Sequence, residues 1–164
     1  MRVFFDTEFT SLGSDPRLLS VGLVSEDGQE LYLELADGWM DAMCSPWVRQ
    51  HVLPMLGKGE QLTRREAGRR IGDWLATITV QPTLLGDTDW DTTLLTQLLE
   101  ESGLTSTGFT VELLAFQSRE QARAFDVAKQ QYFQLQNATP HHALTDANAF
   151  RSAWTEIFAY LPTD

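Results

Sequence analysis

Short apolar runs in the first part of the chain predict three strands. The run at 2–9 is apolar and rich in Phe, which is typical of a β-strand. Similar runs predict strands near 18–24 and 30–35, and Asp27 with Gly28 is a typical hairpin-turn pair between them. We therefore expect the first three strands to form an antiparallel meander.

Beyond the meander, the apolar spacing alternates between that of helices and that of strands. We expect a partly helical segment at 40–56 and a helix at 62–78. A strand at 79–85, a helix at 91–102, a strand at 110–116 and a helical region at 118–135 follow. A last helix follows Pro140, and its apolar stripe consists of Ala147, Phe150, Trp154, Ile157, Phe158 and Leu161. This order predicts an α/β fold in one domain over 1–164, with a mixed five-stranded sheet flanked by helices.

Two acidic residues interrupt the first apolar strand. Side chains alternate across a strand, so Asp6 and Glu8 share one face, with their Cα atoms roughly 6–7 Å apart. Two ionised carboxylates in a half-buried space repel each other and lose hydration unless a cation or a proton offsets their charge. A hard divalent ion is the simplest cation for this purpose. An exposed edge strand would explain the same pair if it stood alone.

A third carboxylate lies near the beginning of the last helix. Asp146 precedes the apolar stripe at the N-terminal end, where the helix dipole favours negative charge. Positions five apart in a helix are about 140° out of phase, so His141 reaches the same site as Asp146 only if it precedes the regular helix. Thr139 and Pro140 favour that arrangement, because Pro is common at helix starts. Taken alone, a histidine at a helix start needs no chemical role.

The middle of the chain offers three candidates for a fourth carboxylate, Asp87, Asp89 and Asp91. Asp91 follows an aromatic residue and precedes an apolar helical run, and an ordinary N-terminal helix cap would explain it as well. The alternating acids also suggest a calcium-binding loop. Thr92 and Leu98 exclude that loop, because they stand where it needs Gly and Glu.

In combination, three segments of the chain resemble the sequence motifs of the DEDDh, or DnaQ-like, 3′–5′ exonucleases. They are Phe5-Asp6-Thr7-Glu8, Trp90-Asp91 and His141-x-Ala-Leu-x-Asp146-Ala147, in the family's order and at its usual spacings. The resemblance covers nearly the whole chain and implies a ribonuclease H-like fold. The start of the chain and its short hairpin strands are also similar to the small exoribonucleases of the RNase AS type.

The resemblance assigns a role to each motif residue. It implies four metal-binding carboxylates, which are Asp6, Glu8, Asp91 and Asp146. It also makes His141 the general base and leaves His142 as a bystander. Two Mg²⁺ or Mn²⁺ ions about 4 Å apart can activate the attacking water and stabilise the leaving 3′-oxygen, and Asp6 is expected to bridge them. Imidazole titrates near neutral pH, which suits it to taking a proton from that water.

The charge of the chain limits how it can hold a nucleic acid. There are 12 basic and 23 acidic residues, which gives a net charge of −11. Nucleic-acid binders usually carry basic patches, so this charge argues against a long duplex footprint. The simplest interpretation is that the protein binds only a few terminal nucleotides, through metal ions and local contacts. The basic cluster at Arg64, Arg65, Arg69 and Arg70 is expected to be a solvated helix face.

Aromatic residues near the motifs are candidates for stacking on unpaired bases, although such residues more often belong to a core. The three stacking candidates are Phe9, Trp47 and Trp90. As residues that bind the substrate, we expect Thr7, Phe9 and Trp90. The RNase AS resemblance implies single-stranded RNA or 3′ overhangs as substrate, a preference for adenylate and a homodimer. The choice between RNA and DNA depends on a contact to the 2′-hydroxyl that the sequence does not locate.

These expectations combine into one function with two alternatives. We expect an exoribonuclease that uses Mg²⁺ or Mn²⁺ and releases nucleoside 5′-monophosphates from 3′ ends. A DNA exonuclease of the proofreading or repair kind would share every catalytic residue, and a non-catalytic module would use the same fold to bind a partner protein. The chain has no run of about 18 apolar residues, no leader-like start and a single cysteine, Cys44, so we expect a cytoplasmic protein without a membrane segment.

Overall fold

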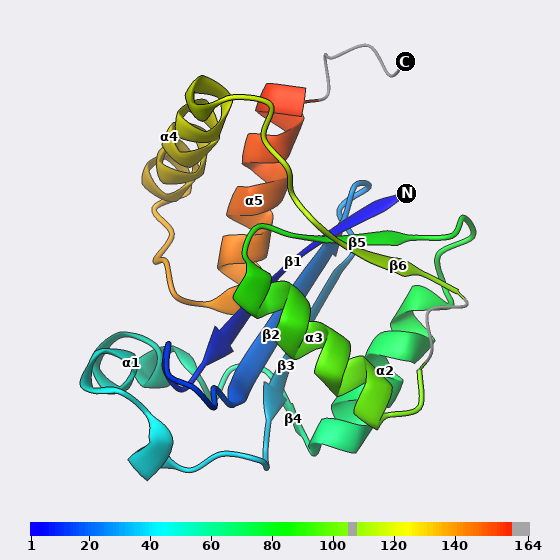
Figure 1. The fold of residues 1–164 in the computed structure, drawn as a ribbon, viewed down its shortest axis with the longest axis vertical. Helices are drawn as coiled ribbons and strands as arrows, with labels where there is room; N and C mark the ends of the chain where they lie inside the picture. Colours follow the sequence, from blue (N-terminus) through cyan, green and yellow to red (C-terminus); the bar gives the residue numbers. More distant parts are fainter. Residues whose placement is uncertain (105–107, 159–164) are drawn as a thin grey trace.

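The central element of the fold is a mixed β-sheet. The computed structural model describes residues 1–104 and 108–158, and within these ranges the sheet has six strands in the order β4-β3-β2-β1-β5-β6 (Figure 1). The strands are β1 (Arg2–Phe9), β2 (Leu18–Ser25), β3 (Glu30–Leu35), β4 (Glu60–Leu62), β5 (Thr83–Gly86) and β6 (Thr110–Leu113). As predicted, β1, β2 and β3 form an antiparallel meander, whereas β4, β5 and β6 each run parallel to a neighbour.

The strand β4 corrects the prediction of five strands. It pairs in parallel with β3 and lies between the segments predicted at 40–56 and 62–78, overlapping the second only at Leu62. A segment of this length is too short to show the alternation that marks a strand. The helix α2 (Arg64–Leu75) begins only after it. Its start is fixed by a capping box, in which the Thr63 and Glu66 side chains each accept a hydrogen bond from the backbone of the other residue.

The remaining helices lie close to their predicted positions. They are α1 (Pro46–His51), α3 (Asp89–Glu101), α4 (Arg119–Gln136) and α5 (Ala143–Phe158), with short 3-10 turns at Asp41–Met43 and Leu53–Met55. The strand β5 begins at Thr83, later than expected, and β6 ends at Leu113, earlier than expected. Leu161, predicted to belong to the apolar stripe of the last helix, lies outside the described residues. Among the described residues, no helix combines the length and apolar character needed to cross a membrane.

Helices cover both faces of the sheet, with α5 and α4 on one side and α2 and α3 on the other (Figure 1). The strand β1 contributes to both cores because its side chains alternate. Val3 and Phe5 belong to the core shared with α2 and α3, whereas Phe4 packs against Phe150 in the core shared with α4 and α5. Asp6 and Glu8 lie an even number of residues from Phe4, so their side chains point to the α5 side.

The start of α5 lies directly against β2 at Gly22. Gly22 pairs with Asp6 across the antiparallel ladder, and a Cβ atom at Gly22 would lie 2.3 Å from the backbone N of Leu144 and 2.4 Å from the backbone C of Ala143. Such distances leave no room for a side chain. The glycine therefore allows the first turn of α5, which carries Asp146, to approach the acidic face of β1.

We predict that Gly22→Ala destabilises the protein by about 3 kcal/mol, because the added methyl group must push α5 away from the sheet. Urea denaturation followed by circular dichroism measures this free energy of unfolding. Gly13→Ala is the matched control, since Gly13 lies in an exposed loop and its added Cβ would meet the Ser11 hydroxyl oxygen at 3.2 Å. Equal stability of the two variants would contradict the close contact between α5 and β2.

Candidate metal centre

Three carboxylates meet on the α5 side of β1. One side-chain oxygen from each of Asp6, Glu8 and Asp146 lies within 4.8 Å of the other two. Asp6 and Glu8 come from β1, and Asp146 comes from the first turn of α5. Glu8 and Asp146 are each only 9% exposed. The structure thus brings together the acidic residues of the first and third sequence motifs.

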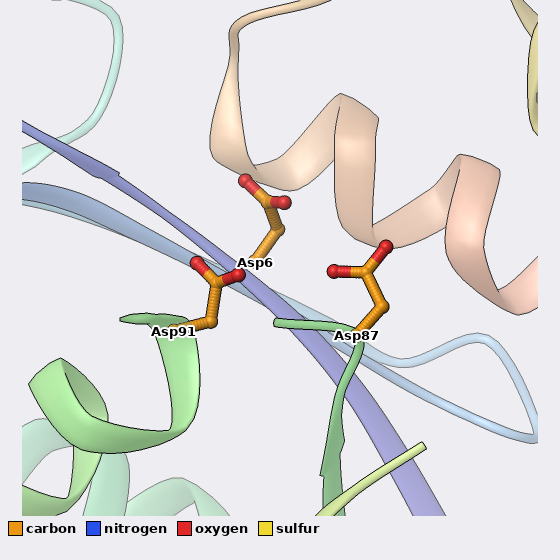
Figure 2. Close-up of side chains that lie close together, drawn as sticks. All are labelled: Asp6, Asp87 and Asp91. Atoms are coloured by element: carbon orange, nitrogen blue, oxygen red, sulfur yellow. The ribbon is translucent and has the colours of Figure 1, made fainter. Parts of the chain in front are cut away.

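A second group of carboxylates adjoins the first and shares Asp6 with it. Oxygens of Asp6, Asp87 and Asp91 lie within 4.8 Å of one another, with Asp87 directly after β5 and Asp91 in the first turn of α3. Figure 2 shows the three side chains directed to the same side of β1. We call the two groups together the carboxylate cluster, which consists of Asp6, Glu8, Asp87, Asp91 and Asp146.

Two threonines hold the carboxylate of Asp91, which is 3% exposed. The backbone N–H and the hydroxyl of Thr7 donate to its Oδ1 at 3.0 and 2.6 Å, and the hydroxyl of Thr88 donates to its Oδ2. The alternative that Asp91 caps α3 is wrong, because Thr88 is the cap and accepts a hydrogen bond from the Asp91 backbone N–H. Asp89, the third candidate of this stretch, is exposed and lies in neither acidic group.

The turn before α5 holds Asp146 in place. The backbone N–H of His142 donates to Oδ2 of Asp146 at 3.0 Å, and the ring of His142 stacks on Tyr32 with ring centres 4.2 Å apart. His142, expected to be a bystander, therefore supports the site through its backbone. His141 precedes the helix, as its convergence with Asp146 requires, and has a left-handed φ of 68°.

The ring of His141 lies against α1. Its centre is 4.6 Å from that of Trp47, in an edge-to-face arrangement, and 6.4 Å from that of His51. Burial and the nearby His51 lower the pKa of His141 below the ordinary histidine value. Neither acidic group found among the described residues includes this histidine. His141 is thus a neutral base at neutral pH, five residues before a member of the carboxylate cluster.

Burial and repulsion from neighbouring acids raise the pKa values of four carboxylates of the cluster, which are Asp6, Glu8, Asp91 and Asp146. Burial is the largest cause at Asp6, whose pKa lies well above the ordinary value, and Asp91 and Asp146 raise it further. Burial, Asp146 and Asp91 raise the pKa of Glu8 to about 8. Burial raises the pKa of Asp146 to about 6, although Lys129 opposes the increase. Without a cation, the cluster therefore retains protons at neutral pH.

The carboxylate cluster fits a hard divalent cation. Its donors are carboxylate oxygens, the ligands that Mg²⁺ and Mn²⁺ prefer in proteins. Its raised pKa values show that the negative charge is not balanced by the protein alone. Asp6 is the one residue that the two acidic groups share.

An apolar pocket of about 380 Å³ opens beside Glu8. It is lined by Glu8, Phe9, Ser11, Leu12, Ser45, Trp47 and Val48. Two of the predicted stacking residues, Phe9 and Trp47, thus lie in one pocket, and Trp90 packs with its ring centre 6.1 Å from that of Phe9. Thr7 is buried and bonded to Asp91. Substrate binding by Thr7, Phe9 and Trp90 stays a prediction.

Two residues belong to the site without having been assigned a role from the sequence, Asp87 and Lys129. Asp87 was one of three acids in its stretch, and the family pattern favoured Asp91 instead. Lys129, from α4, forms an ion pair with Asp87. A signal for Asp87 exists, because it follows a buried strand, and ligands gather at the carboxyl ends of strands in open α/β sheets. Lys129 is a single lysine on an amphipathic helix, which no sequence pattern distinguishes.

Comparison with solved structures places the chain in a known fold class. E. coli exonuclease I, in a zinc-bound complex with single-stranded DNA, matches 97% of this chain and 42% of its own length, with a TM-score of 0.61 at 12% identity. S. pombe Pop2p, in a form with bound Mg²⁺ and Mn²⁺, matches 97% of this chain and 83% of its own, with a TM-score of 0.57 at 12% identity. At these identities the likeness concerns the fold, and the predicted α/β, ribonuclease H-like exonuclease fold is confirmed.

Sequence comparison gives a shorter match at higher identity. A stretch of 56 residues is 45% identical to proteins from two strains of Mycobacterium tuberculosis, both named 3′-5′ exoribonuclease. The match covers 34% of this chain and spans 33% of the length of those relatives. No family model matches the chain. Together with the fold, these relatives confirm the resemblance to DnaQ-like 3′–5′ exonucleases that the three motifs indicated.

We predict that the metal-free protein becomes less stable as the pH rises above neutral. A carboxylate with a raised pKa favours the folded state fully below its ordinary pKa, and this contribution is lost as the pH rises through the raised value. For Glu8 the loss is spread between its ordinary pKa of 4.5 and the raised value of about 8, and it is complete above the raised value. Between about pH 6.5 and 9, the free energy of unfolding should fall by about 2 kcal/mol. Urea denaturation in EDTA measures the change.

Two controls identify the source of this pH dependence. Glu8→Gln should weaken it, because the substitution removes one carboxyl group with a raised pKa and one cause of the raised pKa of Asp6. Saturating Mg²⁺ should also flatten it in the wild-type protein, because a bound cation replaces the protons and stabilises the folded state. A stability in EDTA that rises across the same range would contradict the raised pKa of Glu8.

Proposed function

We propose that this protein is a metal-dependent 3′–5′ exoribonuclease that hydrolyses single-stranded RNA or 3′ overhangs to nucleoside 5′-monophosphates. The observation that carries the proposal is the shared position of Asp6, which joins two groups of carboxylates whose oxygens lie within 4.8 Å of one another. In the proposal, two Mg²⁺ or Mn²⁺ ions are held by Asp6, Glu8, Asp91 and Asp146. The relatives named exoribonucleases and the exonuclease fold support the same activity.

Each acidic residue has a distinct place in this mechanism. Asp6 serves both groups, Glu8 and Asp146 complete the first, and Asp91 belongs to the second. When bound, two divalent ions activate the attacking water and stabilise the leaving 3′-oxygen. The hydrogen bonds from Thr7 fix the Asp91 carboxylate before a substrate arrives, which reduces the reorganisation that binding would require.

His141 is the proposed general base that takes a proton from the attacking water. Its lowered pKa, caused by burial and His51, keeps the imidazole neutral and able to accept a proton at neutral pH. Its ring packs against Trp47, which lines the pocket that Glu8 also lines. This contact with α1 supports the proposed role, because it keeps the imidazole near the pocket that would receive the end of a substrate.

The apolar pocket beside Glu8 is the proposed site of the terminal nucleoside. Phe9 and Trp47 offer aromatic surfaces there, and stacking on aromatic rings tolerates every base. A net charge of −11 gives no electrostatic hold on a long phosphate backbone. The protein would therefore engage a few nucleotides at a 3′ end and release one mononucleotide in each cycle.

A DNA 3′–5′ exonuclease is the second candidate, because exonuclease I, whose fold this chain shares, was solved with single-stranded DNA. RNA is preferred because the relatives at 45% identity are named exoribonucleases. Matched RNA and DNA oligonucleotides that compete in one reaction separate the two candidates. A module that only binds a partner protein would hydrolyse neither. The homodimer implied by the RNase AS resemblance and the cytoplasmic location expected from the sequence stay predictions, and gel filtration tests the first.

We predict that Asp6→Asn reduces hydrolysis by about a thousandfold or more, because it removes the carboxylate common to both acidic groups. The measurement follows the shortening of a 5′-labelled single-stranded RNA in Mn²⁺. Asp89→Asn is the matched control, since it removes an exposed acid two residues from Asp91. Its rate should stay within about twofold of wild type. Hydrolysis that proceeds equally well in EDTA, or at the wild-type rate in Asp6→Asn, would refute the proposal.

We predict that His141→Ala lowers kcat by about a hundredfold or more, the usual contribution of a general base. Mn²⁺ affinity should change little, because His141 belongs to neither acidic group among the described residues. The wild-type rate should fall at acid pH as His141 becomes protonated, and the variant should lack that part of the pH profile. His142→Ala is the control, since its backbone N–H still reaches Asp146. An unchanged pH profile in His141→Ala would exclude this histidine as the base.

A further inference from the structure

Lys129 lies within the acidic site, although the proposed chemistry does not use it. Its Nζ forms an ion pair with Oδ2 of Asp87, and the two side chains are only 21% and 11% exposed. The same Nζ lies 5.9 Å from the ring centre of Phe125 on α4. The chain has two lysines, and the other, Lys58, is exposed. A lysine that is mostly buried is uncommon unless it is paired, so its position calls for a reason.

Stability alone does not explain this ion pair. Taking two charges out of water costs free energy that their attraction often fails to recover, and apolar residues of similar size frequently serve the fold better. Burial lowers the pKa of Lys129, yet Asp87, Asp6 and Asp146 together raise it above its ordinary value. The ammonium group therefore stays charged, and it is attracted by three members of the carboxylate cluster.

The charges of the site balance when Lys129 is counted. The carboxylate cluster carries five negative charges when all its members are ionised. Two divalent ions bring four positive charges, and Lys129 supplies the fifth. Without Lys129, the loaded site would keep one uncompensated negative charge in a place where water is largely excluded, which is costly.

We infer that Lys129 is a positioning residue of the metal centre: it engages Asp87, so that this carboxylate does not act as a further metal ligand, and it sets how tightly the other four carboxylates hold divalent ions. The inference rests on the proposed function, because it needs divalent ions at the carboxylate cluster. It adds a fixed cation and a fifth carboxylate to that site, neither of which the catalytic proposal requires.

Mn²⁺ binding to the metal-free protein, measured by isothermal titration calorimetry without nucleic acid, tests the inference. Lys129→Met removes the charge and frees Asp87, so the dissociation constant for Mn²⁺ should fall about tenfold. Asp87→Asn removes one acid and leaves the ammonium unpaired near the ions, so the constant should rise about tenfold. The double variant should return to within about threefold of wild type, because both changes act on one pair.

Arg123→Met is the matched control, because Arg123 is an exposed residue of the same helix and its loss changes the net charge equally. Its Mn²⁺ affinity should equal that of wild type. An unchanged or weakened affinity in Lys129→Met, or a double variant outside the threefold range, would overturn the inference. If circular dichroism shows that Lys129→Met does not fold, Asp87→Asn decides alone, and an affinity equal to wild type overturns the inference.

The same titrations separate the inference from the proposed function. Wild-type protein that binds no Mn²⁺ would overturn both. Wild-type protein that binds Mn²⁺, with variants at Lys129 and Asp87 that bind it equally well, would overturn only the role of Lys129 and leave the exonuclease proposal intact.

Discussion

The repulsion among five carboxylates gathered at one end of the sheet is the constraint on which the rest of the structure depends. Burial and the neighbouring acids raise the pKa values of Asp6 and Glu8, so the folded protein needs protons or cations at this place. Two apolar cores, one on each side of β1, hold the acids together despite that cost. Gly22 contributes as well, because it lets the first turn of α5 touch the strand beside Asp6.

The supporting contacts explain why the site is well ordered before any substrate binds. Asp91 is bonded on both oxygens by Thr7 and Thr88, and Asp146 is bonded by a backbone N–H of the turn that carries His141. The Asp91 carboxylate is therefore held from β1 as well as from the cap of its own helix, and Asp146 is held from the turn before α5, as expected of a preorganised site. The fold shared with exonucleases and the short match to proteins named exoribonucleases agree with the chemistry proposed for it.

Local sequence patterns predicted most of the acidic site, because strand alternation and helix phase are properties of a few neighbouring residues. They placed Asp6 and Glu8 on one face and put His141 ahead of the last helix. They did not decide between two roles for Asp91, since the deciding hydrogen bond joins it to Thr7, 84 residues away. They gave no sign of Lys129, whose role depends on how α4 packs beside the end of β5. The strand β4 was not predicted, because three residues are too few to show the alternation of a strand.

Along β1 the two acids face one side of the sheet, whereas Phe5 and Thr7 face the other, and this alternation has a consequence for folding. If β1 slipped by one position against β2, its inward and outward side chains would exchange places. Asp6 and Glu8 would then enter the apolar core beneath α2 and α3, and Phe5 would face the other acidic residues of the site. Such a mispaired strand is heavily penalised by the very groups that the chemistry requires. The residues proposed to hydrolyse nucleic acid therefore also favour the correct register of β1 over a shifted one.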